Sequence, residues 1–457
     1  MVEESVKTKS QLTKNLFSLA VVQVATYVLP LLSVPIISRI LGPEKFGLIN
    51  FGAAYVAYFT ILITYSFDFT ATRKISKQPD DVDNRNRVFT DVFFTQCLLF
   101  VLATILFSVL LLTIPELQKN QGILIASYSL CVSTLFTQNW IFQAMQDLAK
   151  VALFNITSKI LFTIAIVLVV QKNEDYIWQP LLIGIIQGSI AIWSFFWAIK
   201  RYQIKIGKPS LTKCWAVLKE DRIIFFSLIC VSLYTYTNTV ILGLFQSAEQ
   251  VGYYTAAQRL IIIAQSVLVM PLAQAFYPYV GKAFGESKAL GLTVAQKLIP
   301  LIALFLGLAA IGMFFLGPYV IRAFYGERFE SAITVFQILS VVPLFYALNN
   351  VLGIQIMVNL GMDKQFLYIS AAAGIMSVVF NLLIVKRFGF VGTTVTWLCT
   401  EVFLFITMCL VLKRAKLNPI NLEYFKLSAI KEYANPLLDK FKPVIHMVSR
   451  KLNRSTR

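Results

Sequence analysis

Residues 298–316 read LIPLIALFLGLAAIGMFFL, a run of nineteen residues without one charged or hydrogen-bonding side chain. At a rise of about 1.5 Å per residue, a helix of this length covers roughly the 30 Å apolar core of a bilayer. Similar runs recur along the chain and predict an all-α membrane protein of about twelve transmembrane helices, at 16–37, 46–65, 88–113, 123–142, 152–170, 178–198, 223–245, 260–280, 298–316, 332–358, 366–385 and 391–412.

The composition agrees with a membrane protein and disfavours other classes. Hydrophobic residues make up 57% of the chain and charged residues 14%, whereas soluble domains carry about 25% charged residues. The six cysteines form no CxxC pair, and the one histidine, His446, lies near the end of the chain. Neither a metal site nor a cofactor is therefore expected. The polar first residues predict no signal peptide.

The net charge of +18 comes from lysines and arginines that gather in short loops and in a tail. This is the positive-inside pattern of membrane proteins, and no nucleic-acid partner is expected. The two largest basic groups, at 73–87 and 200–222, follow the second and sixth predicted spans. Placing both in the cytoplasm puts the N- and C-termini there too. The tail then lies on the anionic lipids of the inner leaflet as a helix, or it is a partly disordered basic segment.

The chain is predicted to repeat one plan of six helices. Residues 44–47 (EKFG) stand between the first and second spans, and residues 249–252 (EQVG) stand between the seventh and eighth. Residues 143–145 (QAM) and 355–357 (QIM) form a second such echo at the ends of the fourth and tenth spans. Parallel repeats are typical of transporters. We therefore expect three parts, an N-terminal six-helix lobe at 1–205, a C-terminal six-helix lobe at 206–412 and a basic cytoplasmic tail at 413–457.

Polar side chains in or beside the spans are the candidate site residues. Basic side chains outnumber acidic ones there, which predicts an anionic substrate. In the competing interpretation, a row of polar side chains on one helix only forms hydrogen bonds to a neighbouring helix. Arginines at helix ends then only extend to the membrane surface. The candidates for a cationic substrate-binding cavity are Lys159, Arg39, Arg259 and Arg73; for further polar lining, Gln23, Asn155, Asn238, Gln265 and Asn349; and for coupling carboxylates, Glu401 and Asp68.

A lipid-linked sugar donor is the kind of cargo that needs such a lining. Its diphosphate would lose its hydration in an apolar slab at a cost far above thermal energy. Lysine and arginine side chains replace that hydration, and arginine grips phosphate through two parallel hydrogen bonds. Hydroxyl and amide side chains supply partners for the sugars.

Three stretches carry a family resemblance. Residues 35–48 (PIISRILGPEKFGL), residues 139–143 (NWIFQ) and residues 251–259 (VGYYTAAQR) resemble segments of the Wzx-type O-antigen and capsule repeat-unit flippases. These flippases form part of the polysaccharide transporter branch of the multidrug/oligosaccharidyl-lipid/polysaccharide (MOP) exporter superfamily. The first stretch also runs on, with the same likeness, to Arg73.

The resemblance implies two six-helix lobes in a V, a central cationic cavity and an alternating-access cycle, either passive or driven by an ion gradient. It implies an undecaprenyl-diphosphate-linked oligosaccharide as cargo and the bacterial inner membrane as location. It also implies the polysaccharide polymerase machinery as a further candidate partner.

Other functions stay open at this point. A cation-coupled multidrug exporter of the MATE type would need carboxylates inside the first lobe, where only Asp68 and Asp91 are candidates and both lie near helix ends. A membrane-embedded glycosyltransferase or polymerase would need a large outer loop, and the predicted outer loops are short, so no enzymatic activity is expected. A structural scaffold would need no charge inside the membrane.

Overall fold

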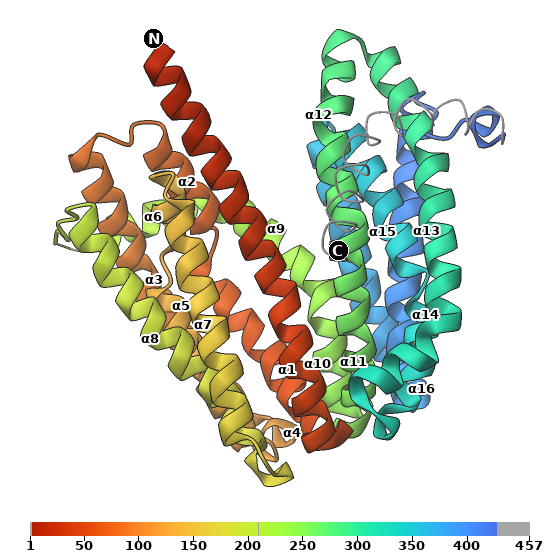
Figure 1. Ribbon diagram of the computed structural model, residues 1–457, viewed down its shortest axis with the longest axis horizontal. Helices are drawn as coiled ribbons and strands as arrows, with labels where there is room; N and C mark the ends of the chain where they lie inside the picture. Colours follow the sequence, from red (N-terminus) through yellow and green to blue (C-terminus); the bar gives the residue numbers. More distant parts are fainter. Residues whose placement is uncertain (1, 209, 427–457) are drawn as a thin grey trace, which may run out of the picture. The chain divides into compact units, whose positions relative to one another are not determined.

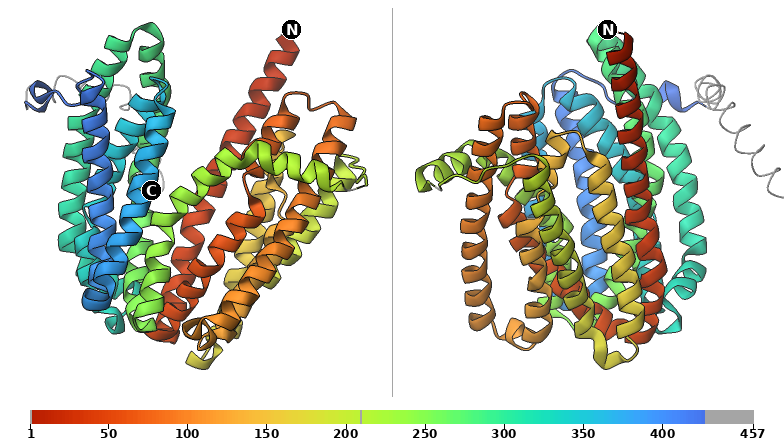
Figure 2. Two further views of the ribbon diagram at one scale, coloured as in Figure 1. Left: turned by 180° about the vertical axis from the view of Figure 1, so that it is seen from behind. Right: turned by 60° about the vertical axis from the view of Figure 1, so that its left-hand side comes forward.

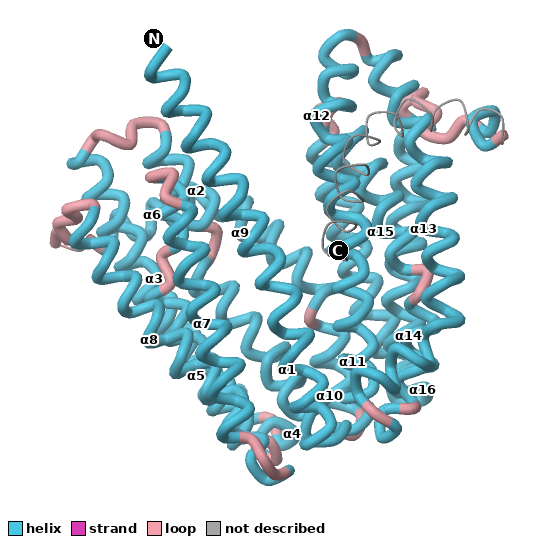
Figure 3. The backbone as a smooth tube through the Cα atoms, in the orientation of Figure 1, coloured by secondary structure: helices cyan, strands magenta, loops and turns pink. Residues whose placement is uncertain are grey.

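The computed structural model describes residues 2–208 and 210–426, with side chains for 33–208, 210–233 and 235–426 (Figure 1). Helices make up nearly all of these residues and no strand occurs among them (Figure 3). The described helices include eight that are long and apolar enough to cross a membrane, or nine if the bent pair α9 and α10 counts as one span. The fold class is confirmed as an all-α, multi-pass membrane protein. The count of twelve helices and the cytoplasmic termini stay predictions.

The helices follow one another with short connections. Their bounds are α1 Val2–Thr64, α2 Phe67–Ser76, α3 Val82–Thr113, α4 Pro115–Gln118, α5 Gln121–Phe136, α6 Asn139–Ala144, α7 Leu148–Val169, α8 Trp178–Arg201, α9 Leu211–Thr235, α10 Thr237–Phe245, α11 Ala248–Ala264, α12 Met270–Glu286, α13 Lys288–Tyr325, α14 Ser331–Leu339, α15 Val342–Asn350 and α16 Asp363–Arg414. Single 3-10 or π turns are η1 Asn173–Ile177, η2 Gln265–Val269, η3 Glu327–Phe329, η4 Val351–Val358 and η5 Leu422–Phe425.

Two of the long helices are each interrupted by one glycine. Gly42 inside α1 has φ 68° and ψ 177°, and Gly389 inside α16 has φ 54° and ψ −135°. Only glycine adopts such torsions without a steric cost, because it has no Cβ. The predicted spans 16–37 and 46–65 lie on either side of Gly42, and 366–385 and 391–412 lie on either side of Gly389. Each long helix is therefore two helices that meet at a glycine.

Four predicted spans are broken where one helix was expected, namely 123–142, 223–245, 260–280 and 332–358. The span 123–142 is divided between α5 and α6, because Gln138 turns its side chain inward at the break. Gln138 Nε2 donates to Gln96 Oε1 at 2.8 Å, and Trp140 Nε1 donates to Gln138 Oε1 at 2.6 Å. The span 260–280 contains the π turn η2 just before Pro271. A proline lacks the N–H that would continue the ladder and clashes with the carbonyl four residues earlier, so the wider turn accommodates it.

The described residues divide into two compact units. Unit 1 takes those in Met1–Ala257, Pro318–Val335 and Gly374–Thr396, and unit 2 takes those in Gln258–Gly317, Phe336–Ala373 and Trp397–Arg457. The lobes expected at 1–205 and 206–412 are defined by the sequence repeat, whereas these units are defined by contacts within the structure. The two lobes therefore stay a prediction. The proposed membrane-surface helix of the tail falls mostly on residues 427–457, outside the described part of the chain.

In unit 1, the helices α1, α5, α7 and α8 pack side by side (Figures 1 and 2). Small residues allow α5 and α8 to approach closely, because a Cβ on Gly184 of α8 would overlap the Ser129 side chain of α5. Ser133 Oγ then donates to the carbonyl of Gly184 at 2.9 Å. Helices in membranes commonly pack through small residues that allow close approach, with a hydroxyl hydrogen bond between the helices.

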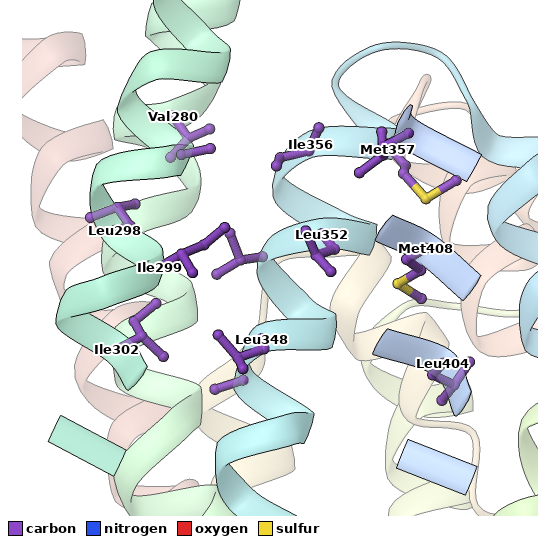
Figure 4. Packing of buried hydrophobic residues seen from close by; sticks show 14 of the residues in the cluster. Val280, Leu298, Ile299, Ile302, Leu348, Leu352, Ile356, Met357, Leu404 and Met408 are labelled. Carbon is purple, nitrogen blue, oxygen red and sulfur yellow. The ribbon is translucent and has the colours of Figure 1, made fainter. Parts of the chain in front are cut away.

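In unit 2, an apolar core joins α12, α13, α15, η4 and α16 (Figure 4). The decisive helix is α13, which carries the run 298–316. Leu298, Ile302 and Leu306 are buried in this core, whereas Leu308 and Phe315 of the same run are 61% and 69% exposed. A helix that is apolar on its buried face and on its exposed face needs lipid on the second one.

Candidate functional site

Lys159 lies on α7 with a half-buried side chain, one turn after the half-buried Asn155. The exposed apolar side chains of α7, among them Ile160, Ile164 and Leu168, form a stripe on another face of the helix. Among the described residues, no carboxylate forms an ion pair with Lys159. A positive charge therefore lies inside an apolar helix, off its most exposed face and without a counter-ion, which is costly unless a polar or charged partner reaches it.

The three predicted arginines have different surroundings. Arg39 is exposed near the end of the first half of α1, and its Nη2 donates to the carbonyl of Ala323 at 2.5 Å. Arg73 is exposed on α2 and lines a cavity together with residues of α3 and α9. Arg259 is half-buried on α11. The cavity that Arg73 lines includes neither Arg39 nor Lys159.

Asn238 belongs to a neutral buried cluster in unit 1. Its Oδ1 accepts from Asn381 Nδ2 at 2.9 Å and from Ser377 Oγ at 3.5 Å, and Thr393 Oγ1 donates to Asn381 Oδ1 at 3.0 Å. None of these four residues is more than 1% exposed. The cluster ties α10 to both halves of α16 beside Gly389, so its hydrogen bonds hold three helical segments together.

Asn349 and Glu401 come together in unit 2. Asn349 Nδ2 donates to Glu401 Oε2 at 2.8 Å and to the Glu401 carbonyl at 3.0 Å. Glu401 is 4% exposed and Asn349 is 7% exposed. The structure thus joins one predicted lining residue to one predicted coupling carboxylate, and among the described residues no lysine or arginine pairs with that carboxylate.

The other candidates are not joined to these clusters. Gln265 is half-buried and begins the π turn η2, and Asp68 is exposed in the first turn of α2. The side chain of Gln23 lies outside the described residues.

The EKFG and EQVG segments, which the sequence shows as a repeat, also touch each other, and the repeat alone does not predict this contact. A Cβ on Gly47 would overlap the carbonyl oxygen of Ala248, and a Cβ on Gly252 would overlap the carbonyl oxygen of Pro43. Each glycine therefore lies against the backbone that opens the other segment. Phe329 packs edge-on against Phe46 and Tyr253, with ring centroids 5.7 Å and 6.4 Å away. The glycine shared by both segments is the sequence signal that could have indicated this contact.

Comparisons with known proteins agree along most of the chain. A protein of Escherichia coli (strain K12) is 28% identical over 414 residues, which cover 90% of this chain and 98% of that protein. A protein of Shigella dysenteriae is 24% identical over 404 residues, covering 86% and 98%. Both carry the name "Putative O-antigen transporter".

Solved structures share the fold at low sequence identity. The lipid II flippase MurJ in an inward closed conformation matches with a TM-score of 0.69 at 12% identity, covering 88% of each chain. An inward-facing multidrug resistance MATE family transporter of the MOP superfamily matches with a TM-score of 0.67 at 15% identity, covering 88% of this chain and 99% of that one. The chain therefore shares the fold of these two proteins, and the two relatives named as O-antigen transporters confirm the resemblance to the polysaccharide branch.

A family model described as "Polysaccharide biosynthesis protein" matches residues 12–284. The match takes in all of the predicted N-terminal lobe except its first residues and continues through α11 into α12. Because the match covers more than half of the sequence, this chain belongs to the polysaccharide biosynthesis protein family.

Proposed function

We propose that the protein is a transporter of O-antigen type that flips undecaprenyl-diphosphate-linked oligosaccharide repeat units across the bacterial inner membrane. The observation that carries the proposal is the similarity to two relatives named as O-antigen transporters, which extends over at least 86% of this chain and 98% of each relative. Membership of a polysaccharide biosynthesis family agrees with such a cargo.

Lys159 supports an anionic cargo. It is a half-buried cation within an apolar helix and has no described carboxylate partner. A diphosphate that passes Lys159 would gain a charge-assisted hydrogen bond and would compensate the buried cation at the same time. We assign Lys159 the main substrate-binding role in a central cationic cavity. The further lining of this cavity is assigned to Arg39, Arg73, Arg259, Gln23, Asn155, Asn238, Gln265 and Asn349.

The transport cycle proposed here is alternating access by two six-helix lobes, 1–205 and 206–412, with both termini in the cytoplasm. The tail 413–457 then meets the anionic lipids of the inner leaflet, and the polymerase machinery receives the flipped repeat unit. Glu401 is the candidate coupling residue, because a buried carboxylate without a cationic partner must be protonated or bind a cation. Asp68 is the second candidate.

A strain that lacks this gene provides the test. Deletion should remove surface polysaccharide and let lipid-linked repeat units accumulate on the cytoplasmic face. Lys159→Ala should lower surface polymer by about tenfold or more at unchanged protein level, while Lys159→Arg should retain much of it. Lys119→Ala is the matched control, because Lys119 is an exposed lysine in the same unit. Full surface polymer from Lys159→Ala would remove the assigned role.

The second candidate function is a cation-coupled multidrug exporter, which the MATE-like fold allows. It predicts a different result from the same deletion strain. Surface polysaccharide would stay normal, and the cells would become sensitive to toxic organic cations.

A further inference from the structure

A cavity of about 660 Å³ lies in unit 1 at the ends of α2, α3 and α9. Its volume falls within the range of roughly 300–1,000 Å³ that is usual for small-molecule sites. Its charged lining comes from all three helices and consists of Arg73, Lys74, Lys77, Arg87, Asp91 and Glu220.

The positive charges of this lining are only partly used within the protein. Lys74 Nζ pairs with Glu220 Oε2 at 2.8 Å and lies 3.8 Å from the buried Asp221, so Lys74 ties α2 to α9. Among the described residues, Arg73, Lys77 and Arg87 form no ion pair. These three cations face one remaining carboxylate, that of Asp91, and the cavity keeps an excess of positive charge.

The segment between α2 and α3 carries Lys77 and Gln78 of this lining, and contacts within the protein hold it in place. Arg85 is 7% exposed, and it donates from Nη1 to the Pro79 carbonyl and from Nη2 to the Tyr202 carbonyl, both at 2.9 Å. Asn84 Oδ1 accepts from Arg87 Nη2 at 3.0 Å, which orients the guanidinium without neutralising it. A preorganised set of cations loses little conformational entropy on binding an anion.

The surroundings of the cavity are those of a lipid–water boundary. It lies where the candidate span Ser33–Ser76 ends and where α3 begins. Val88, Val92 and Val217 form an apolar part of its wall. On α9, Leu211 and Trp215 are 74% and 71% exposed and one helical turn apart. An exposed tryptophan beside apolar and basic residues is typical of the membrane interface.

We propose that this cavity binds the phosphate group of a lipid whose acyl or prenyl chain stays in the membrane. Arg73, Lys77 and Arg87 contact the phosphate oxygens, and the valine wall and the exposed face of α9 contact the first carbons of the chain. Arginine and lysine together favour phosphate over a carboxylate, because the guanidinium matches two phosphate oxygens. On the predicted topology this cavity lies at the cytoplasmic leaflet, and that placement rests on the proposed function. The binding of a lipid phosphate itself does not.

The lipid has two sources with the same chemistry, the prenyl phosphate of the cargo and an anionic phospholipid of the bilayer. Purified full-length protein, reconstituted in phosphatidylcholine nanodiscs, is titrated separately with undecaprenyl phosphate, with phosphatidylglycerol and with inorganic phosphate. Binding is measured by native mass spectrometry. Saturable binding of either lipid supports the proposal, and the tighter of the two identifies the source.

The test variant is Arg73→Gln with Lys77→Gln and Arg87→Gln. It should bind the lipid about tenfold more weakly or worse, since charge-assisted hydrogen bonds to phosphate are lost. The matched control is Lys200→Gln with Lys205→Gln and Lys208→Gln, three exposed lysines on the same predicted side of the membrane. This control removes the same charge and should bind as the wild type does.

A charge-conserving variant, Arg73→Lys with Lys77→Arg and Arg87→Lys, guards against misfolding and should retain most of the binding. Equal lipid affinity of the glutamine variant and the wild type would overturn the proposal, as would binding of inorganic phosphate alone. Because the readout is binding, failure here would leave the surface-polysaccharide assay unaffected, and failure of that assay would leave this site standing.

Discussion

Two of the buried polar clusters in the apolar helices, one from each compact unit, differ in charge. In unit 1, Asn238, Ser377, Asn381 and Thr393 are neutral and hydrogen-bond one another across helical segments. In unit 2, Glu401 accepts from Asn349, without a cationic partner among the described residues.

The difference separates two uses of polarity inside a membrane protein. The neutral amide and hydroxyl groups bond to one another, with Asn238 Nδ2 left without a partner, so the effect of the cluster is to hold helices together. A carboxylate in the same setting carries a large cost when it is ionised, and such residues usually serve ion or proton movement. Changes in the neutral cluster should therefore alter stability, and changes at Glu401 should alter transport.

The largest effect is expected from Glu401→Gln. The amide keeps the shape of the side chain and still accepts from Asn349, but it can neither ionise nor hold a cation. We expect surface polysaccharide to fall by about tenfold or more, with the protein level and melting temperature near those of the wild type. If the glutamine variant were fully active, Glu401 would serve only as a hydrogen-bond acceptor. The two clusters would then not differ in function.

The next effect is expected from Asn381→Leu in the neutral cluster. This change removes the bonds to Asn238 and Thr393 and leaves both without their shared partner. Each lost interhelical bond in a membrane is worth roughly 0.6–1.7 kcal/mol, so the loss of stability should be about 1–3 kcal/mol. Thermal melting in detergent measures it. Transport per folded molecule should be unchanged, and a specific transport defect at normal stability would contradict the assignment.

A smaller effect on both quantities is expected from Asn349→Leu. Glu401 loses its donor, so we expect transport to fall roughly threefold and stability to fall by about 1 kcal/mol. Asn350→Leu is the matched control, because Asn350 is half-buried, adjacent, and makes no side-chain hydrogen bond among the described residues. If both leucine variants behaved alike, the Asn349–Glu401 bond would have no special role.

The smallest effect is expected from Thr393→Val, which should cost about 0.6 kcal/mol of stability because one cross-segment bond is lost. Thr394→Val is a close control. The Thr394 hydroxyl is also buried, but it donates to the Phe390 carbonyl of its own helix at 2.7 Å. Thermal melting of the two variants should rank Thr393→Val below Thr394→Val. The reverse order would indicate that the cluster contributes little to stability.

The sequence predicted the membrane helices well because the signal for each one is local. The run 298–316 needs no partner to be recognised, and Lys159 stands out because its neighbours are apolar. The breaks within spans were harder to predict. The inward turn of Gln138 depends on Gln96, which is 42 residues away on α3.

The polar contacts could not be predicted because they join distant parts of the chain. Asn349 and Glu401 are 52 residues apart, and Asn238 and Asn381 are 143 residues apart. Helical spacing shows which side chains share a face, but it does not show which two faces meet. The cavity of Arg73, Lys77 and Arg87 depends in the same way on Arg85, which joins the nearby Pro79 carbonyl to the Tyr202 carbonyl 117 residues away.

The contact between Gly47 and Gly252 places a joint restriction on two helical segments, one in α1 and one in α11. Each glycine rests on the backbone just ahead of the other segment's glutamate, so the arrangement is self-complementary, as between two copies of one surface about a two-fold axis. A four-residue pattern that occurs twice in the chain, as EKFG and EQVG, supplies both sides of this contact. Neither helical segment can gain a residue or a side chain at this point unless the other segment changes with it.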